Sequence, residues 1–115
     1  MTITETTGST HTIVTICGTL DASTAPDFRN SPAIADPSRT VVIDLERMDF
    51  LDSSGLGALV GVLRRKQEAN ATILLSCMNP PVRKVFDITG TCKLFHIFDD
   101  TDAANDYAAT YHRGR

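Results

Sequence analysis

The chain has 115 residues, of which 42% are hydrophobic and 22% are charged, and its formal net charge is -3. This length fits one domain with one core, and the slightly acidic balance gives no attraction to nucleic acid or to an anionic membrane. No apolar run approaches the roughly 18 residues that a membrane span needs. The start, Met1 to Glu5, lacks the basic and apolar regions of a secretory signal. We therefore expect one domain, residues 1–115, that is cytoplasmic and contacts neither nucleic acid nor membrane.

The three cysteines, Cys17, Cys77 and Cys92, are far apart and odd in number. Such spacing offers no metal framework and no disulfide scaffold. Because their neighbours are apolar, we interpret them as small core residues of a reduced protein.

Several segments have the composition of β-strands. Residues 10–17 are rich in β-branched side chains, and residues 3–4 before them can supply a hairpin partner. Residues 40–45 and 72–78 are nearly continuous apolar runs, which are typical of strands covered on both faces. A further run of this kind covers residues 94–98.

Helical patterns lie between these strands. Pro32 and Pro37 stop a first short helix. The second has apolar side chains at helical spacing, forming one stripe. Its Gly57 and Gly61 are interpreted as sites of close helix–strand packing, and residues 64–66 (Arg-Arg-Lys) as a solvated face. The four expected helices lie within residues 23–29, from Ser54 onward, from Asn79 to Gly90, and from Thr101 onward.

The alternation of strands and helices with short connections predicts the fold class. It indicates an α/β domain with a largely parallel sheet. We expect a mixed, mostly parallel central sheet of about four to five strands with about four α-helices. The last residues, 112–115, are expected to be frayed.

The run from Met48 to Gly57 connects the strand at 40–45 to the second helix. It places two hydroxyls, Ser53 and Ser54, at or beside the N-cap of that helix. Serine is a preferred N-cap, so the run can be an ordinary helix start. The free N–H groups and the positive end of the helix dipole also form an anion site, so the run can be a place where a serine is modified. The residues leave both interpretations open.

Known catalytic and nucleotide-binding patterns do not fit this run. A phosphate-binding loop needs a lysine after its last glycine, and none follows Gly55 or Gly57. A dinucleotide-binding loop needs a third glycine where Val60 stands. A hydrolase nucleophile needs flanking glycines on both sides, which neither serine has. We therefore expect that the protein is not an enzyme.

Two segments, Val42 to Leu45 and Phe50 to Leu59, carry a resemblance to a known family. Together they closely resemble the signature of STAS domains, specifically the bacterial anti-sigma-factor antagonists. Gly18 to Asp21 resembles the loop after the family's long strand, and Val82 to Gly90 resembles its third helix. The similarity spans roughly residues 12 to 108.

This resemblance implies a binding protein that is switched by phosphorylation. Such proteins bind an anti-sigma factor that is also a serine kinase with a histidine-kinase-like ATPase fold, and binding frees a sigma factor. The kinase phosphorylates the serine before Gly-Leu-Gly, which here is Ser54, and the phosphorylated form dissociates. A separate phosphatase removes the phosphate. ATP and magnesium belong to the partner, so the resemblance implies no cofactor for this chain, and it leaves the oligomeric state open.

The residues implied at the partner contact surround this serine. The modified residue is Ser54, with Ser53 as the alternative, and the expected contacts are Asp21, Asp52, Ser53, Ser54 and Gly55. Asp21 lies near the serine if its loop leaves the same end of the sheet; otherwise it is a turn carboxylate. Asp52 can orient the serine, contact the kinase or serve as a helix-start charge. Ser53 can cap the helix.

The chain departs from the family pattern in two places that concern binding. Thr19 replaces an acidic residue that is common in that loop. Residues 30–37 lie where the family usually has a longer leucine-rich helix, so the first helix and any partner surface on it are in question. A second class of function keeps the fold but not the sigma factor: a sensory or scaffold module that binds a nucleotide or lipid-like ligand, or acts in a larger stress-signalling complex.

Overall fold

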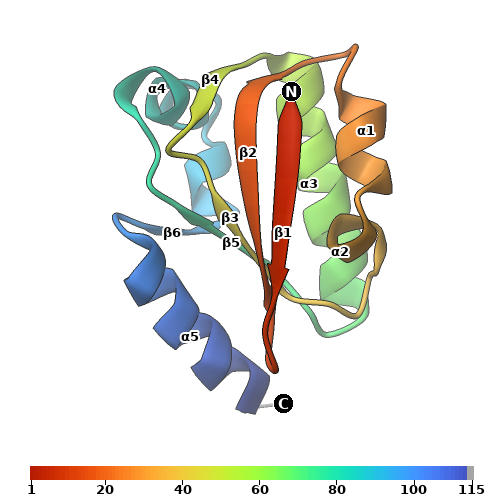
Figure 1. The fold of residues 1–115 in the computed structure, drawn as a ribbon. Helices are drawn as coiled ribbons and strands as arrows, with labels where there is room; N and C mark the ends of the chain where they lie inside the picture. The colour runs from red at the N-terminus through yellow and green to blue at the C-terminus, as the bar shows by residue number, and fades with distance from the viewer. Residues whose placement is uncertain (114–115) are drawn as a thin grey trace.

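The computed structural model describes the backbone of residues 1–113 and the side chains of residues 1–110. It contains a six-stranded sheet with helices packed against it (Figure 1). The hydrogen-bonded order is β1-β2-β3-β5-β6, and β4 pairs with β2. The strands are β1 (Thr2–Thr7), β2 (Thr12–Leu20), β3 (Val41–Asp44), β4 (Met48–Leu51), β5 (Ile73–Ser76) and β6 (His96–Phe98). The helices are α1 (Ala25–Asn30), α2 (Pro32–Ala35), α3 (Ser53–Glu68), α4 (Pro80–Thr89), the 3-10 turn η1 (Thr91–Lys93) and α5 (Thr101–Arg113).

The predicted fold class is confirmed. Only the β1–β2 pairing is antiparallel, and the other pairings in the described part of the chain are parallel. The sheet has one strand more, and the fold one α-helix more, than the expected numbers. The tail predicted at residues 112–115 continues α5 at its first two residues and otherwise lies outside the described residues. Among the described residues, no helix is both long and apolar enough to cross a lipid bilayer.

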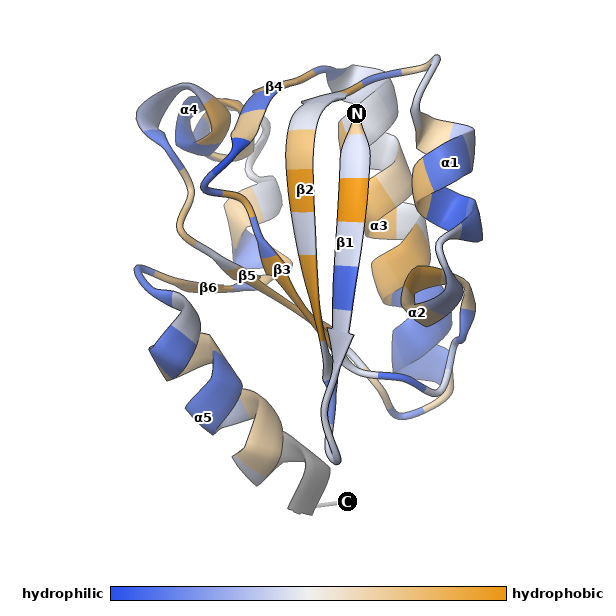
Figure 2. Ribbon diagram, viewed as in Figure 1, coloured by the Kyte–Doolittle hydropathy of each residue, from blue (hydrophilic) through white to orange (hydrophobic). Residues whose placement is uncertain are grey.

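The centre of the sheet is buried on both faces, as its continuous apolar runs predict. Ile43 and Leu75 belong to a core shared with α1 to α4. Val42 and Leu74, one position away on the same strands, belong to a second core with alanines of α5. Figure 1 shows α1, α2 and α3 on one side of the sheet and α5 on the other, and Figure 2 shows the apolar residues of the strands between them. The alternation of side chains along each strand therefore feeds two cores.

The extra strand, β4, lies where the sequence predicts only a connecting loop. Met48 and Leu51 are buried, while Asp49 and Phe50 between them are exposed, so no alternating pattern marks this strand. It pairs with the end of β2, where the register shifts after Gly18. Gly18 has a φ of 108°, which a residue with a side chain rarely adopts. We conclude that β4 forms because it pairs with the bulged end of β2, and not because of its own sequence pattern.

The atypical segment at residues 30–37 folds into the end of α1 and the short helix α2. Pro32 ends α1, as predicted, and also opens α2, because proline is suited to the first turn of a helix. The carboxylate of Glu5 in β1 accepts hydrogen bonds from the Ser31 hydroxyl and, at 2.9 Å, from the Ala33 N–H. The start of α2 is therefore fixed to the first strand.

Lys66 fixes the other end of α2, and its position corrects the expectation of a solvated face at residues 64–66. The two arginines before it are exposed, but the Lys66 side chain is fully buried. Its Nζ donates hydrogen bonds of 2.6–2.7 Å to the carbonyl oxygens of Ala33, Asp36 and Arg39. Burial lowers the pKa of Lys66 to about 8, although the nearby Asp36 carboxylate acts in the opposite direction. The long side chain crosses from α3 to these three carbonyl groups, of which the Asp36 carbonyl oxygen also accepts the Arg39 N–H at 3.2 Å.

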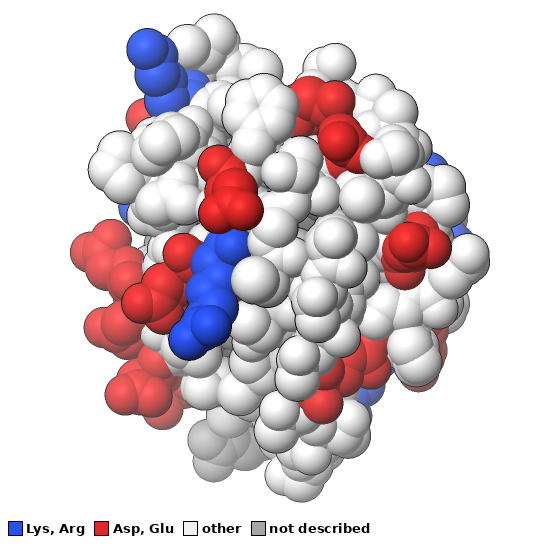
Figure 3. All heavy atoms as spheres, turned by 45° about the horizontal axis from the view of Figure 1, so that its top comes forward, with Lys and Arg blue, Asp and Glu red and all other residues white. Residues whose placement is uncertain are grey.

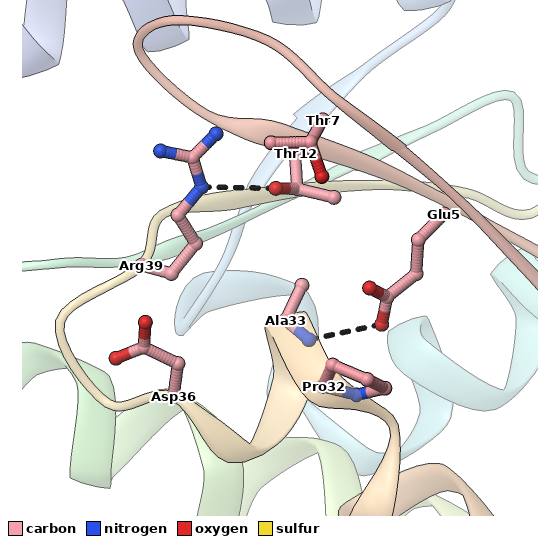
Figure 4. A pocket seen from close by; sticks show the side chains of 7 residues that line it. All are labelled: Glu5, Thr7, Thr12, Pro32, Ala33, Asp36 and Arg39. Carbon is pink, nitrogen blue, oxygen red and sulfur yellow. Dashed lines mark hydrogen bonds between the residues drawn. The ribbon is translucent and has the colours of Figure 1, made fainter.

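A cavity of about 210 Å³ lies between the β1–β2 hairpin and α2 (Figure 4). Figure 4 shows Glu5 directed at the Ala33 N–H and Arg39 directed at Thr12. The Arg39 Nε donates to the Thr12 hydroxyl at 2.9 Å, and its guanidinium also donates to the Gly8 carbonyl oxygen at 2.5 Å. Glu5 and Arg39 thus connect the hairpin to α2 and the loop after it, while the Asp36 carboxylate accepts hydrogen bonds from Ser38 in its own loop.

Two interpretations of small residues are also corrected. Gly57 and Gly61 are exposed, and nothing lies within 4 Å of the place where a Cβ would stand, so neither serves close packing. Cys17 is exposed on β2, while Cys77 and Cys92 are half-buried, so the cysteines are not simply core residues. Small size allows burial but does not determine which face of an element a residue occupies.

Candidate functional site

The start of α3 is capped by Asp52 rather than by a serine. The Asp52 Oδ1 accepts the Gly55 N–H at 2.9 Å, and the Asp52 carbonyl oxygen accepts the Leu56 N–H at 2.9 Å. Ser53 and Ser54 are the first two residues of the helix. The interpretation of Asp52 as a helix-start charge therefore has direct geometric support, and the suggestion that Ser53 caps the helix is wrong.

Both serines at this helix start are exposed. Within the described part of the chain, no hydrogen bond is recorded for the hydroxyl or the backbone N–H of Ser53 or Ser54. The first N–H groups of a helix have no partner inside it, so these two point toward solvent at the positive end of the dipole. Ser54 thus has a hydroxyl that another protein can reach, beside two free N–H donors.

Gly55 lets the start of α3 lie in close contact with the end of β2. A Cβ at this position would stand 2.2 Å from the Leu20 carbonyl oxygen and 2.9 Å from Leu51 Cδ1. Only glycine allows the helix to begin so close to the two strand ends. Gly55 is itself buried, so a contact with a partner would depend on the close fit that it permits rather than on its own surface.

Asp21 leaves the sheet at the same end as the serines. Leu20 and Leu51 are paired neighbours in the parallel β2–β4 ladder, and the Asp52 N–H donates to the Leu20 carbonyl oxygen at 3.3 Å. The residues after these two, Asp21 and Asp52, therefore begin adjacent loops. From the sequence, Asp21 is expected near Ser54 if the two loops leave the same end of the sheet, and they do.

Asp21 is also a turn carboxylate. Its Oδ1 accepts hydrogen bonds from the Ser23 hydroxyl at 2.7 Å, the Ser23 N–H at 2.9 Å and the Thr24 N–H at 3.1 Å. These donors, the Ser23 hydroxyl first, hold the pKa of Asp21 below its usual value, so the group is ionised at neutral pH. The two alternatives for Asp21 are thus compatible, since the turn fixes a negative charge beside the helix start.

The surface around the helix start is acidic and partly apolar. In Figure 3 the end of the molecule that carries the start of α3 comes forward, and acidic side chains cover more of this face than basic ones. Phe50, two residues before the cap, has 53% of its surface exposed. Gly57 and Gly61 continue the exposed side of α3 without side chains. A partner can therefore approach the helix closely, and an added negative charge here adds to existing negative charge.

The residues described by the structure contain no group of three or more histidine, cysteine or acidic side chains arranged to hold a metal ion. Among the described residues, the groups with lowered pKa values, Asp21, Asp36 and Lys66, do not form a cluster at the serines. The site thus consists of accessible hydroxyls, fixed carboxylates and a helix dipole, which suits recognition by another protein.

A family model of the STAS domain matches residues 2–104. The chain belongs to the STAS domain family. The match begins at β1 and ends within α5, so it includes the sheet and all the residues of the serine site. The resemblance drawn from the Phe50 to Leu59 signature is confirmed.

Several relatives of this STAS domain are anti-sigma factor antagonists. The anti-sigma-B factor antagonist of Staphylococcus aureus is 29% identical over 91 residues, which cover 77% of this chain and 84% of the relative. The anti-sigma F factor antagonist of Paenibacillus polymyxa is 31% identical over 91 residues, which cover 76% and 78%.

The fold of this STAS domain is also that of a solved antagonist. The anti-sigma factor antagonist SpoIIAA in its unphosphorylated form has a TM-score of 0.79 at 23% identity, with 95% and 97% of the chains covered. The phosphorylated form of SpoIIAA from Bacillus has a TM-score of 0.70 at 24% identity, with 92% and 98% covered. At these identities the two structures establish the shared fold.

The STAS domain brings the five expected site residues together at one end of the sheet. Asp52, Ser53, Ser54 and Gly55 occupy consecutive positions at the helix start, and Asp21 lies in the adjacent loop. Sequence reasoning missed the exposed Phe50, which the signature includes but whose strand was not predicted. The signal that could have found it is an aromatic residue placed two positions before a polar helix start.

Proposed function

We propose that this STAS domain is an anti-sigma-factor antagonist that is switched off by phosphorylation of Ser54. In this proposal the unmodified protein binds an anti-sigma factor that is also a serine kinase of the histidine-kinase-like ATPase fold. Binding releases a sigma factor, phosphorylation of Ser54 ends the complex, and a phosphatase restores the protein. The chain acts as a binding protein and not as an enzyme, and ATP and magnesium are held by the kinase.

One observation carries this proposal: the Ser54 hydroxyl is exposed at the second residue of α3 and has no partner within the described residues. A kinase must reach the hydroxyl oxygen, and a structural serine would normally use it in a hydrogen bond. Asp52 takes the capping role, so Ser54 is not needed for helix stability. The antagonist names of the curated relatives support the same function.

The proposed switch is electrostatic. A phosphate adds about -1.5 to -2 charges near neutral pH, comparable with the formal net charge of -3. The free N–H groups and dipole at the helix start favour these oxygens, so the fold is expected to stay intact. At an interface the same charge lies beside Asp21 and Asp52 and must be desolvated or expelled. Such misplaced charge weakens binding by about 2–5 kcal/mol.

The test is to incubate the protein with ATP, magnesium and the candidate ATPase-fold anti-sigma kinases of its own organism. We expect mass spectrometry to place a single phosphate on Ser54. Ser54→Ala is expected to abolish the modification, and Ser53→Ala, the matched control, to leave it in place. Phosphate on Ser53 alone, or no phosphate with any of these kinases, would contradict the proposal.

A second test separates charge from folding. Ser54→Asp is expected to abolish binding to the kinase while leaving the circular dichroism spectrum unchanged, because Asp is well tolerated in the first turn of a helix. Ser53→Asp adds the same charge one residue earlier and serves as the control. Loss of structure in Ser54→Asp would show that this serine has a structural role instead.

A further inference from the structure

The outer face of β1 and β2 carries a shallow groove that the serine site does not use. Its volume is about 370 Å³, and it is lined by Thr2, Thr4, Thr15, Cys17 and Arg47. The β1–β2 register pairs Thr2 with Cys17 and Thr4 with Thr15, so these four side chains form two adjacent rows on one face. The groove is therefore a built part of the sheet and not a gap between loops.

Within the described residues, α5 covers this face only near the start of β2, where Ile13 packs against its alanines, and no helix residue lines the groove. The helix α5 packs on β3, β5 and β6, and the other helices share the core on the opposite side of the sheet. No hydrogen bond is recorded within the described residues for the hydroxyls of Thr2, Thr4 or Thr15. The groove therefore offers three unengaged hydroxyls that can donate to, or accept from, the backbone of an extended peptide.

Arg47 provides a single positive charge at the groove. Arg47 is exposed, and it forms no ion pair with a described residue. The nearby Asp44 carboxylate is turned into its own loop, where it accepts the Glu46 N–H at 2.9 Å. The Arg47 guanidinium is thus available to a carboxylate from outside.

Phe50 lies between Arg47 and the serine site along the chain, and its aromatic side chain is exposed. Phe50 pairs in the β2–β4 ladder with Thr19, which lies two residues after Cys17 on β2. Along its own strand, Phe50 lies two residues before the Asp52 cap. An exposed aromatic side chain loses unfavourable contact with water when a partner covers it, and such residues often dominate binding energy. A protein docked at Ser54 can extend across Phe50 into the groove.

We propose that this groove holds an extended segment of the partner kinase, which places a carboxylate on Arg47 and an apolar side chain on Phe50. The inference rests on the proposed function and adds to it a second contact, away from the phosphate-accepting hydroxyl. Threonine hydroxyls bind the backbone of the segment, and the Arg47 charge selects an acidic side chain. Recognition is thereby separated from the chemistry at Ser54.

Cys17 is a natural reporter for this contact, because it is exposed whereas Cys77 and Cys92 are half-buried. The wild-type protein is alkylated with iodoacetamide alone and with saturating kinase plus ADP, and each cysteine is followed by mass spectrometry. We expect kinase to slow alkylation of Cys17 at least about fivefold without slowing it at Cys77 or Cys92. Ser54→Asp, which is expected not to bind, should show no protection.

The variant Arg47→Glu tests the charge. It is expected to raise the KM for phosphorylation of Ser54 about tenfold with kcat unchanged, since it reverses the sign at the contact but not at the hydroxyl. Phe50→Ala should raise KM by a similar factor. Arg65→Glu, at the far exposed end of α3, is the control for net charge, and circular dichroism checks the fold of each variant.

The outcomes separate the two proposals. Normal phosphorylation of Ser54 with unprotected Cys17, or with unchanged KM in Arg47→Glu, overturns the groove contact and leaves the proposed function standing. Absence of phosphorylation and binding in the wild type overturns both. Protection of Cys17 that grows with the concentration of this chain alone shows a second copy on the face and also overturns the groove contact.

Discussion

The two ends of α3 differ in the burial and the hydrogen bonding of their polar side chains. At the start, Ser53 and Ser54 are exposed and have no recorded hydrogen-bond partner among the described residues. At the end, Lys66 is buried and donates to three carbonyl oxygens. One helix therefore carries an accessible site and a structural anchor, twelve residues apart in the sequence.

This difference teaches how a modification site can remain independent of stability. A buried charge is tolerated only when its hydrogen bonds are satisfied, so every change at Lys66 affects folding. A hydroxyl in the first turn of a capped helix has no such duty, and its modification can change binding alone. The contrast predicts that substitutions near Lys66, Gly55 and Asp52 report on folding, whereas substitutions of Ser54 report on partner affinity.

The largest effect is expected at the anchored end. Lys66→Met keeps the length of the side chain but removes the three hydrogen bonds that Nζ donates, and it should lower the free energy of unfolding by about 3 kcal/mol. Arg65→Met, at the exposed neighbour, should change it by less than about 0.5 kcal/mol. Urea denaturation measures both. Equal effects of the two variants would remove the contrast between the ends of α3.

The next effect concerns the close contact at the start of the helix. Gly55→Ala would place a Cβ 2.2 Å from the Leu20 carbonyl oxygen, so we expect a loss of about 2 kcal/mol from the strain of moving helix and strand apart. Gly57→Ala has open space and should instead stabilise the helix by roughly 0.5–1 kcal/mol. Thermal unfolding of the pair measures the sign. Destabilisation by Gly57→Ala would show that the exposed side of α3 is more constrained than the structure indicates.

A third effect depends on pH. The pKa of Lys66 is about 8 in the folded protein, against an ordinary value of 10.5, so between these values the unfolded chain binds more protons than the folded one. Stability should therefore rise with pH across this window, by at most about 1.4 kcal/mol per pH unit. The stability of Lys66→Met, measured by urea denaturation at pH 8, 9 and 10, provides the baseline. A difference between wild type and variant that does not grow with pH would contradict the lowered pKa.

The smallest effect separates the two residues at the helix start. Asp52→Ala removes the side chain that caps α3 and should cost about 1 kcal/mol. Ser53→Ala, one residue later, should cost almost nothing because its hydroxyl has no recorded bond in the described structure. Chemical denaturation distinguishes them. If Ser53→Ala lost more stability than Asp52→Ala, Ser53 rather than Asp52 would be the capping residue.

Much of the fold was predictable because its signals are local. The apolar runs at 40–45 and 72–78 indicated strands buried on both faces, and both lie at the centre of the sheet. The cap of α4 was readable in the same way: Asn79 Oδ1 accepts the Val82 N–H at 3.0 Å, and Gly90 ends the helix at a φ of 75°. Such features depend on hydrogen bonds within a few residues, so the sequence contains them.

In the candidate site, too, the features that depend on neighbouring residues were predictable and those that depend on strand pairing were not. Ser54 could be predicted at a helix start because glycine, serine and apolar spacing are local signals. The cap could not be assigned among Asp52, Ser53 and Ser54, since all three residue types cap helices and only the backbone angles decide between them. The nearness of Asp21 depends on the pairing of β2 with β4, which no local pattern indicated.

The sequence by itself determined the alternating α/β pattern, the family signature and the serine at the start of α3, because each follows from residues near one another in the chain. Only the tertiary structure decided that Lys66 is an anchor rather than a solvated charge, that Gly55 rather than Gly57 or Gly61 packs closely, and that Phe50 is exposed. The physical reason is that burial and close contact depend on which segments, distant in sequence, meet in space.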